Sequence, residues 1–147
     1  MNNPTYNELI TDRSLSVLKS VFKNERNSEH VRYLALMEYT AKFYNANNRA
    51  LLPGYNTCQY NKTASSQGCA IGQHLTGPVP QEHNTKIITM LLNHCSWLIP
   101  SWMYSLDKYF LMSVQKLHDI PQHWDAKGIT PYGKRYFEIH MNKWLNL

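Results

Sequence analysis

The sequence has no long apolar run, few cysteines and a charged fraction of only 17%. Its most apolar stretch, residues 87–99, is interrupted by polar residues and is shorter than the ~20 apolar residues that span a bilayer. The first residues lack the charged and apolar regions of a signal peptide. The low charged fraction also argues against a coiled coil or an acidic tail. We therefore expect a cytoplasmic protein without a membrane segment.

The cysteines are too few, and odd in number, to form a disulfide framework. Cys58, Cys69 and Cys95 are expected to be reduced, as in cytosolic proteins. Together with His74 and His94 they include zinc-ligand types, but they lack the close spacing of structural zinc sites. The sequence therefore predicts neither a metal site nor a cofactor.

Hydrophobic residues make up 43% of the 147 residues, which is enough for a core. We expect a single domain, residues 1–147, of the mainly α class and at the margin of α+β. It would be a compact helical domain of about five helices with one small β-hairpin or an irregular Cys/Gly loop.

Five segments show helical recurrence of apolar residues, with capping residues at their starts. The expected helices span residues 4–23, 28 to about 45–48, 84–99, 101–119, and 131 onwards. In the fourth helix an apolar stripe is expected to face the core: Met103, Leu106, Phe110, Val114 and Leu117. On the same helix Lys108, Gln115 and Lys116 are expected to face away. In the last helix the apolar face is expected to comprise Tyr136, Phe137, His140, Met141 and Trp144.

The glycine-rich middle of the chain interrupts this helical pattern. Residues 58–60 and 68–72 are predicted to be two short strands joined by a polar segment. Residues 39–81 also contain no Asp or Glu, so part of the net charge of +5 lies there. A net positive charge favours anionic partners.

Basic and aromatic residues form two candidate partner-binding surfaces. One lies around the loop, at Arg49, Tyr60 and Lys62, and the other on the last helix, at Lys134, Arg135 and Lys143. Cations beside stacking rings suit single-stranded nucleic acid. The same residue types also anchor protein interfaces.

A thiol enzyme is the catalytic alternative, with Cys69 as nucleophile, His118 as base and Asp119 as the orienting carboxylate. This chemistry needs a partly exposed Cys69 within hydrogen-bond reach of His118. Adjacent side chains on a helix diverge, so Asp119 would be a weak orienter. In the structural alternative, Cys69 and Ile71 pack against the helix that bears Leu117. The His118-Asp119 pair then ties a loop by hydrogen bonds.

Three further segments form a recognisable pattern: Cys58-Gln59-Tyr60, Gly68-Cys69-Ala70-Ile71-Gly72, and Val114 to Asp119 followed by Trp124. Together they resemble a family of small uncharacterised proteins from tailed phages and prophages. The chain departs from the family pattern after Gly72, where Gln73 to Gly77 replaces an apolar stretch. The resemblance implies a phage or mobile-element origin and carries over no catalytic role.

The leading functional hypothesis is a non-enzymatic, phage-type binding protein. Its partner would be a host protein or a ribonucleoprotein effector, and its action that of an anti-CRISPR-like inhibitor of a nucleic-acid-handling effector. The first alternative is the cysteine enzyme, and the second is direct binding of RNA or single-stranded DNA.

Overall fold

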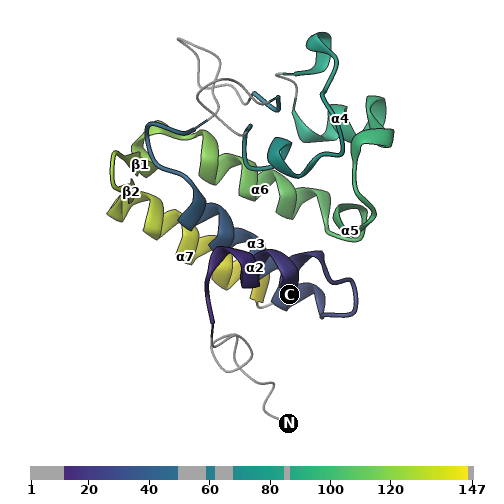
Figure 1. The fold of residues 1–147 in the computed structure, drawn as a ribbon. Helices are drawn as coiled ribbons and strands as arrows, with labels where there is room; N and C mark the ends of the chain where they lie inside the picture. The colour runs from purple at the N-terminus through teal and green to yellow at the C-terminus, as the bar shows by residue number, and fades with distance from the viewer. Residues whose placement is uncertain (1–11, 50–58, 62–67, 85–86, 146–147) are drawn as a thin grey trace.

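A long, buried helix lies at the centre of the computed structural model, which describes residues 12–49, 59–61, 68–84 and 87–145 (Figure 1). This helix, α3 (Glu29–Phe43), packs against α2 (Leu15–Lys23), α6 (Lys108–Asp119) and α7 (Pro131–Leu145). The expectation of a mainly helical domain with one small hairpin is confirmed.

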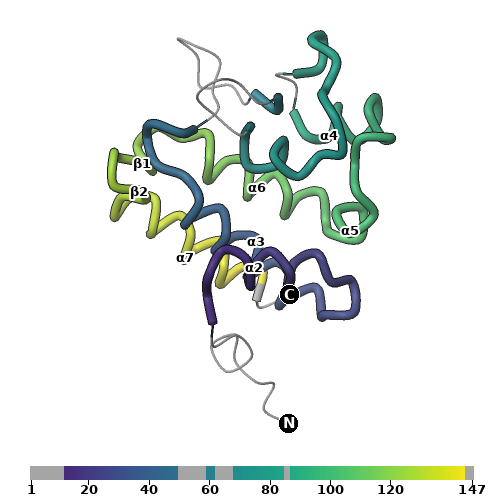
Figure 2. The backbone as a smooth tube through the Cα atoms, in the orientation of Figure 1, coloured from purple at the N-terminus to yellow at the C-terminus, as the bar shows by residue number. Residues whose placement is uncertain are grey.

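Short elements complete the fold, and Figure 2 follows the path of the chain through them. Two are α-helices, α4 (Ile88–His94) and α5 (Ser101–Tyr104). Four are single 3-10 turns: Gly72–His74, Gln81–His83, Ser96–Leu98 and Pro121–His123. The strands β1 (Trp124–Asp125) and β2 (Gly128–Ile129) form an antiparallel hairpin. This hairpin turns the chain from α6 into α7, so the two helices run in opposite directions (Figure 1).

Side-chain caps explain where three of the long helices begin. The hydroxyl of Ser14 accepts the Val17 amide at the start of α2, and that of Ser28 accepts the Val31 amide at the start of α3. The Asp107 carboxylate accepts two amides in the first turn of α6. Each cap satisfies amides that have no partner within the helix. The predicted start of α3 at Ser28 is therefore confirmed.

The core surrounds α3, whose residues 32–40 are all buried. The predicted apolar stripe from Met103 to Leu117 is buried with it, as are Met141 and Trp144 of α7. Arg32 is the one basic residue buried within this core among the described residues. Its guanidinium donates to the Phe22 and Trp102 carbonyls and to the Ser105 hydroxyl. These bonds tie α2 and α5 to α3, and hydrogen bonding makes a buried charge tolerable.

Three predicted helices are shorter than expected. The helix expected over 84–99 begins only at Ile88 and ends at His94, after which the Leu98 carbonyl accepts the Thr76 amide instead of continuing a helix. The helix expected over 101–119 is broken at Ser105, because Asp107 starts a new helix as its N-cap. The first helix, expected over 4–23, is also shorter: it begins at Leu15, because residues 12–14 are not helical and Ser14 is its N-cap. Residues 1–11 lie outside the described residues.

The small hairpin lies elsewhere than predicted. Cys69 donates its amide to the Gln59 carbonyl at 3.0 Å, so the two predicted strand segments are neighbours, but residues 59–60 and 68–72 form no strand. The actual hairpin has a turn in which the Asp125 carboxylate accepts the amides of Lys127 and Gly128. Gly128 adopts a φ of +138°, a value that favours glycine. Cys58 lies outside the described residues.

Gly72 allows the loop to lie directly against Tyr60. A Cβ atom at position 72 would collide with the backbone of Tyr60, whereas one at Gly77 would meet only the end of the Leu98 side chain at 3.3 Å. Backbone atoms cannot move aside as easily as the end of a side chain, so the two glycines differ in their tolerance of substitution.

We expect Gly72→Ala to lower the free energy of unfolding by about 1–3 kcal/mol through overpacking. Gly77→Ala, the matched control, should change it by less than about 0.5 kcal/mol. Urea denaturation of both variants measures the difference. Equal stabilities would show that the contact between Gly72 and Tyr60 does not constrain the loop.

His74 is buried in a box of aromatic rings. The ring centroids of Phe22, Tyr39 and Trp102 lie 5.3, 5.6 and 5.5 Å from that of His74. Its Nε2 atom is buried and has no hydrogen-bond partner among the described residues. Burial, with Lys19 and Lys23 nearby, lowers the pKa of His74 from 6.5 to about 3. His74 therefore stays neutral in the folded chain over the pH range in which a free histidine takes up a proton.

Acid should destabilise the fold through His74. The unfolded chain binds a proton there below pH 6.5 and the folded chain resists it, so this contribution is complete above pH 6.5 and is lost as pH falls towards 3. At pH 5 the loss amounts to about 2 kcal/mol. In His74→Phe the loss of stability between pH 7.5 and pH 5, measured by denaturant titration, should be smaller by about that amount. An unchanged loss would contradict the assignment.

Candidate functional site

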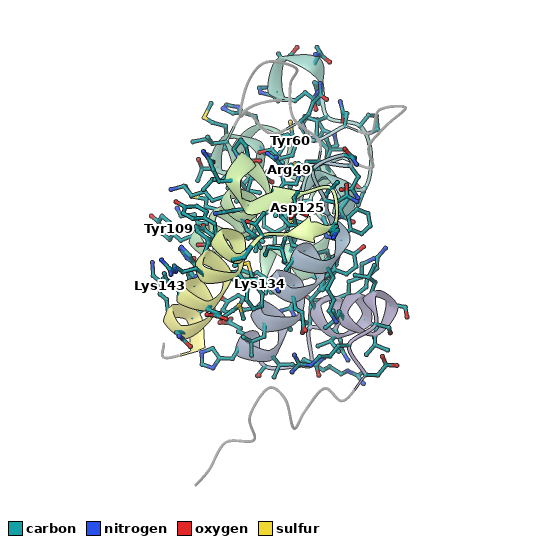
Figure 3. The ribbon with its side chains drawn as sticks, turned by 90° about the vertical axis from the view of Figure 1, so that its left-hand side faces the viewer. Arg49, Tyr60, Tyr109, Asp125, Lys134 and Lys143 are labelled. Carbon is teal, nitrogen blue, oxygen red and sulfur yellow. The ribbon has the colours of Figure 1, made fainter. Side chains whose placement is uncertain are left out.

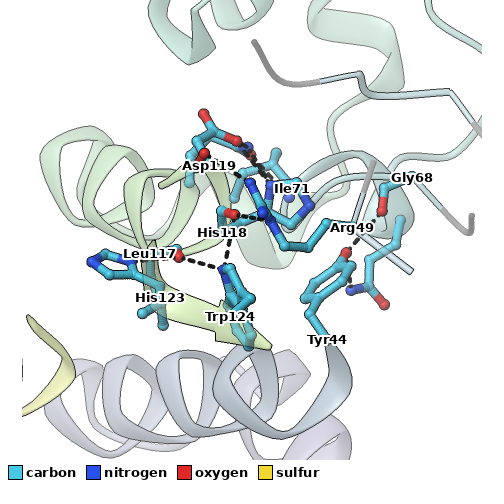
Figure 4. A network of polar contacts seen from close by, with 11 residues as sticks. Tyr44, Arg49, Gly68, Ile71, Leu117, His118, Asp119, His123 and Trp124 are labelled. Atoms are coloured by element: carbon cyan, nitrogen blue, oxygen red, sulfur yellow. Dashed lines mark hydrogen bonds and ion pairs between the residues drawn. The ribbon is translucent and has the colours of Figure 1, made fainter. Parts of the chain in front are cut away.

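The sequence motif that ends in His118 and Asp119 lies at the C-terminal end of α6, where several side chains form a network of hydrogen bonds (Figure 4). The Leu117 carbonyl accepts His123 Nδ1–H at 2.9 Å, and the indole N–H of Trp124 lies 3.0 Å from the carbonyls of both Leu117 and His118. Arg49 donates to the carbonyls of His118 and Asp119, at 2.8 and 2.9 Å. The last carbonyls of a helix have no partner within it, so these side chains act together as its cap.

The same helix end holds the loop that contains Cys69. Gln115 donates to the Asp119 carboxylate at 2.7 Å, and its side-chain oxygen lies 3.4 Å from the Ile71 amide. On the other side of the loop, the Tyr44 hydroxyl donates to the Gly68 carbonyl at 2.8 Å. The expectation that Gln115 faces away from the core is wrong, because its amide is buried and spans two elements.

His118 and Asp119 contact each other directly, contrary to the expectation that they diverge. The distance from His118 Nδ1 to Asp119 Oδ1 is 2.8 Å, and the His118 ring is completely buried. Burial lowers the pKa of His118, and the hydrogen bond and charge of Asp119 partly offset this effect. The histidine is therefore held neutral in a closed environment, as expected for a structural residue.

The cysteine-nucleophile hypothesis is not supported by this geometry. Cys69 has no exposed surface and is disulfide-bonded, whereas nucleophilic attack needs an accessible thiolate. The expectation of reduced cysteines is therefore wrong for Cys69, whereas Cys95 is a free, buried thiol. Cys69 and Ile71 are buried in the same core as Leu117, which confirms the structural alternative.

Two of the predicted loop-surface residues have structural roles, which corrects their assignment as free partner-binding groups. Arg49 caps α6 through the two bonds described above. Tyr60 is 1% exposed, so its ring is unavailable for stacking on a partner. Lys62 lies outside the described residues. No loop surface of the predicted kind can be assembled from the described residues.

The three basic residues predicted on the last helix are all exposed, but they do not share one side of it. At 100° per residue, Lys143 lies about 180° around the helix from Lys134, with Arg135 between them. Figure 3 shows Lys143 at the same edge of the molecule as Tyr109 of α6, and Lys134 displaced towards α3. The predicted patch is therefore divided between two flanks of α7.

A larger basic and aromatic surface is formed by α6 and α7 together. The two helices are fixed side by side by a hydrogen bond from the Tyr136 hydroxyl to the Ser113 carbonyl, at 3.2 Å. We call this surface the α6–α7 face. It comprises Lys108, Tyr109, Lys116, Tyr132, Arg135, Ile139 and Lys143, all of them exposed.

Three large side chains on the α6–α7 face are unusually exposed. Tyr109 and Tyr132 are each 61% exposed and Ile139 is 59% exposed. Sequence reasoning did not single out Tyr109, Tyr132 and Ile139 as exposed surface residues. The outward position of Lys116 was predicted, but its place on the same side of the molecule as Lys143 depends on the antiparallel packing of the two helices. The short turn Asp125 to Gly128 was the available signal for that packing.

A row of stacked rings supports the α6–α7 face from below. The Tyr136 ring lies 4.8 Å from that of His123 and 4.1 Å from that of His140, and His123 also contacts the Tyr132 ring at 5.6 Å. Burial lowers the pKa of His140, and the nearby Lys143, Lys116 and His123 lower it further. The ring contacts of Tyr136 therefore place a row of aromatic side chains under the positively charged surface, and the lowered pKa of His140 favours its neutral form there.

The described residues contain no group of three metal-ligating side chains. His94, one of the residues with a ligand-type side chain, stacks on His83 at 5.3 Å. Within the same part of the chain, no helix is long and apolar enough to cross a membrane. No family model matches the sequence, and no match was found among curated proteins or solved structures.

We expect Arg49→Ala to lower the free energy of unfolding by about 2 kcal/mol, because the two capping bonds of a half-buried cationic group are lost. Lys127→Ala, in the exposed hairpin turn, is the control and should change it by less than about 0.5 kcal/mol. Thermal and urea unfolding measure both. If Arg49 were a free surface cation, the two variants would be equally stable.

Proposed function

We propose that the chain is a non-enzymatic binding protein that docks a partner through the α6–α7 face. In this proposal it is a phage-type inhibitor of a host effector that handles nucleic acid, of the anti-CRISPR kind. It would act in the cytoplasm of the infected cell. That compartment is reducing, so the proposal also requires the fold to tolerate loss of the disulfide at Cys69.

The observation that carries the proposal is the exposure of Tyr109, Tyr132 and Ile139 on one rigid surface, surrounded by cations. Tyrosine and arginine are the residue types that concentrate binding energy at interfaces. These side chains stand on two packed helices, so binding would need little ordering of the surface. The sequence resemblance to small phage proteins supports the biological setting.

The catalytic alternative, with Cys69 and His118, has little support in the described residues. The His118–Asp119 pair is closed off from solvent and the sulfur of Cys69 is already bonded. Both therefore serve the fold. Exposed large side chains also occur outside the α6–α7 face, at Ile87 and Trp97, but among the described residues they are not surrounded by cations in the same number.

Inhibition assays test the proposal directly. Purified CRISPR effector ribonucleoproteins of several types would be assayed for target cleavage in reducing buffer, with and without the chain. We expect inhibition of at least one effector. Lys116→Glu/Lys143→Glu should reduce the inhibition at least tenfold, because two cations of the face are reversed.

Lys127→Glu/Lys134→Glu is the matched control, because it changes the net charge by the same amount at two residues outside the α6–α7 face. It should inhibit as well as the parent chain. Absence of inhibition in every assay would contradict the inhibitor proposal. Equal losses in the two double variants would show that net charge, and not the α6–α7 face, is responsible.

A further inference from the structure

We propose that the α6–α7 face binds single-stranded nucleic acid, with its cations on the phosphates and its exposed tyrosine rings on the bases. This inference rests on the docking surface proposed above and names the chemistry of its partner. It depends on three features of the face: the spacing of its cations, the excess of cations over carboxylates, and the exposure of its rings.

The cations form two rows of matching length. Lys108 and Lys116 lie eight residues apart on α6, and Arg135 and Lys143 lie eight residues apart on α7. Each pair therefore spans about 12 Å along its helix. Packed helices lie about 8–10 Å apart, so the four cations outline a positively charged area wide enough for one strand. Lys108 Nζ lies 5.3 Å from the Tyr109 ring centroid, which places its charge beside that ring.

The carboxylates of α6, of α7 and of their caps are not among the residues that make up the α6–α7 face. Asp107 accepts the amides of the first turn of α6, and Asp119 is bonded to Gln115 and His118. Glu138 lies on the flank of α7 that carries Lys134, about 140° around the helix from Lys143 and about 60° from Arg135, so it borders the face at one edge and is outnumbered by the four cations there. The field over the face is therefore positive, which attracts a polyanion.

The two tyrosine rings are exposed, and their positions along the helices are fixed by local contacts. Tyr132 rests on the His123 ring at 5.6 Å, and His123 is itself fixed by its bond to the Leu117 carbonyl. Tyr109 stands at the start of α6, where Asp107 accepts its amide at 2.7 Å. A strand of nucleic acid uses such rings as stacking platforms without regard to sequence.

An acidic protein surface is the competing partner, and it fits less well. The fully buried centre of a protein interface is mainly apolar, whereas Ile139 is the only aliphatic side chain of the face. The arrangement of cations around open ring surfaces matches a strand of phosphates and bases more closely.

Fluorescence anisotropy tests the inference with defined probes. Labelled twelve-residue oligouridine and oligothymidine would be titrated with the intact chain from 50 to 200 mM salt. A twelve-base-pair duplex and a polyglutamate peptide serve as comparison ligands. We expect the single strands to bind best, with log K falling against log salt at a slope of about −3 for four phosphate contacts. The relative affinities for uridine and thymidine distinguish RNA from DNA.

Variants separate the two kinds of contact. Lys116→Glu/Lys143→Glu should roughly halve the salt slope and weaken binding, and Lys127→Glu/Lys134→Glu should not change the slope. Tyr109→Ala/Tyr132→Ala should weaken binding about tenfold or more at an unchanged slope, because stacking does not release counterions. All these positions are exposed, and circular dichroism would confirm that each variant is folded.

Several results would overturn the inference. They are no binding of single strands at 50 mM salt, equal losses in the two charge variants, no effect of removing the rings, or binding of the duplex as strong as that of the single strands. Equal or tighter binding of polyglutamate would overturn it in favour of an acidic protein. If the chain inhibited an effector but did not bind the oligonucleotides, the proposed function would be retained and this inference would be rejected.

Discussion

The C-terminal cap of α6 is the interaction on which the rest of the structure depends. Carbonyls that a helix leaves unpaired are taken up by Arg49, His123 and Trp124, which come from both sides of α6 in the sequence. Gln115, one turn earlier, holds the loop at Ile71. A single helix end thereby fixes the Cys69 loop and the start of the hairpin, and through the hairpin it sets the position of α7.

Several features of the fold could be predicted because they depend on local chemistry. Ser28 starts α3 by capping it, and the stripe from Met103 to Leu117 is buried because apolar spacing on a helix determines which side faces the core. The break before Asp107 could not be predicted, because the spacing of apolar residues on either side of it is the same as in one continuous helix. The prediction for Gln115 was wrong for another reason. Its polar side chain suggested exposure to solvent, but folding brings it next to the Ile71 amide and the Asp119 carboxylate, with which it forms hydrogen bonds.

The candidate site was predictable in part. The motif residues His118 and Asp119 were recognised, and their structural role was one of the interpretations drawn from the sequence. The predicted basic surfaces lay on the loop and on the last helix, whereas the surface that we propose combines α7 with α6. Arg49 and Tyr60 were misjudged because neither residue type shows by itself whether it faces solvent or donates inward. Only the packing of α6 against α7 brings Lys116 and Lys143 to one surface.

The hairpin turn has a consequence for how this chain can change in length. Residues inserted at the turn between Asp125 and Gly128 would enlarge an exposed connection and leave both helices in place. One residue inserted within α7, by contrast, would rotate every side chain beyond it by about 100° and separate Lys143 from Tyr132. The number of residues between Tyr132 and Lys143 is therefore constrained, because it determines whether both lie on the same side of α7. The length of the hairpin turn is not constrained in this way.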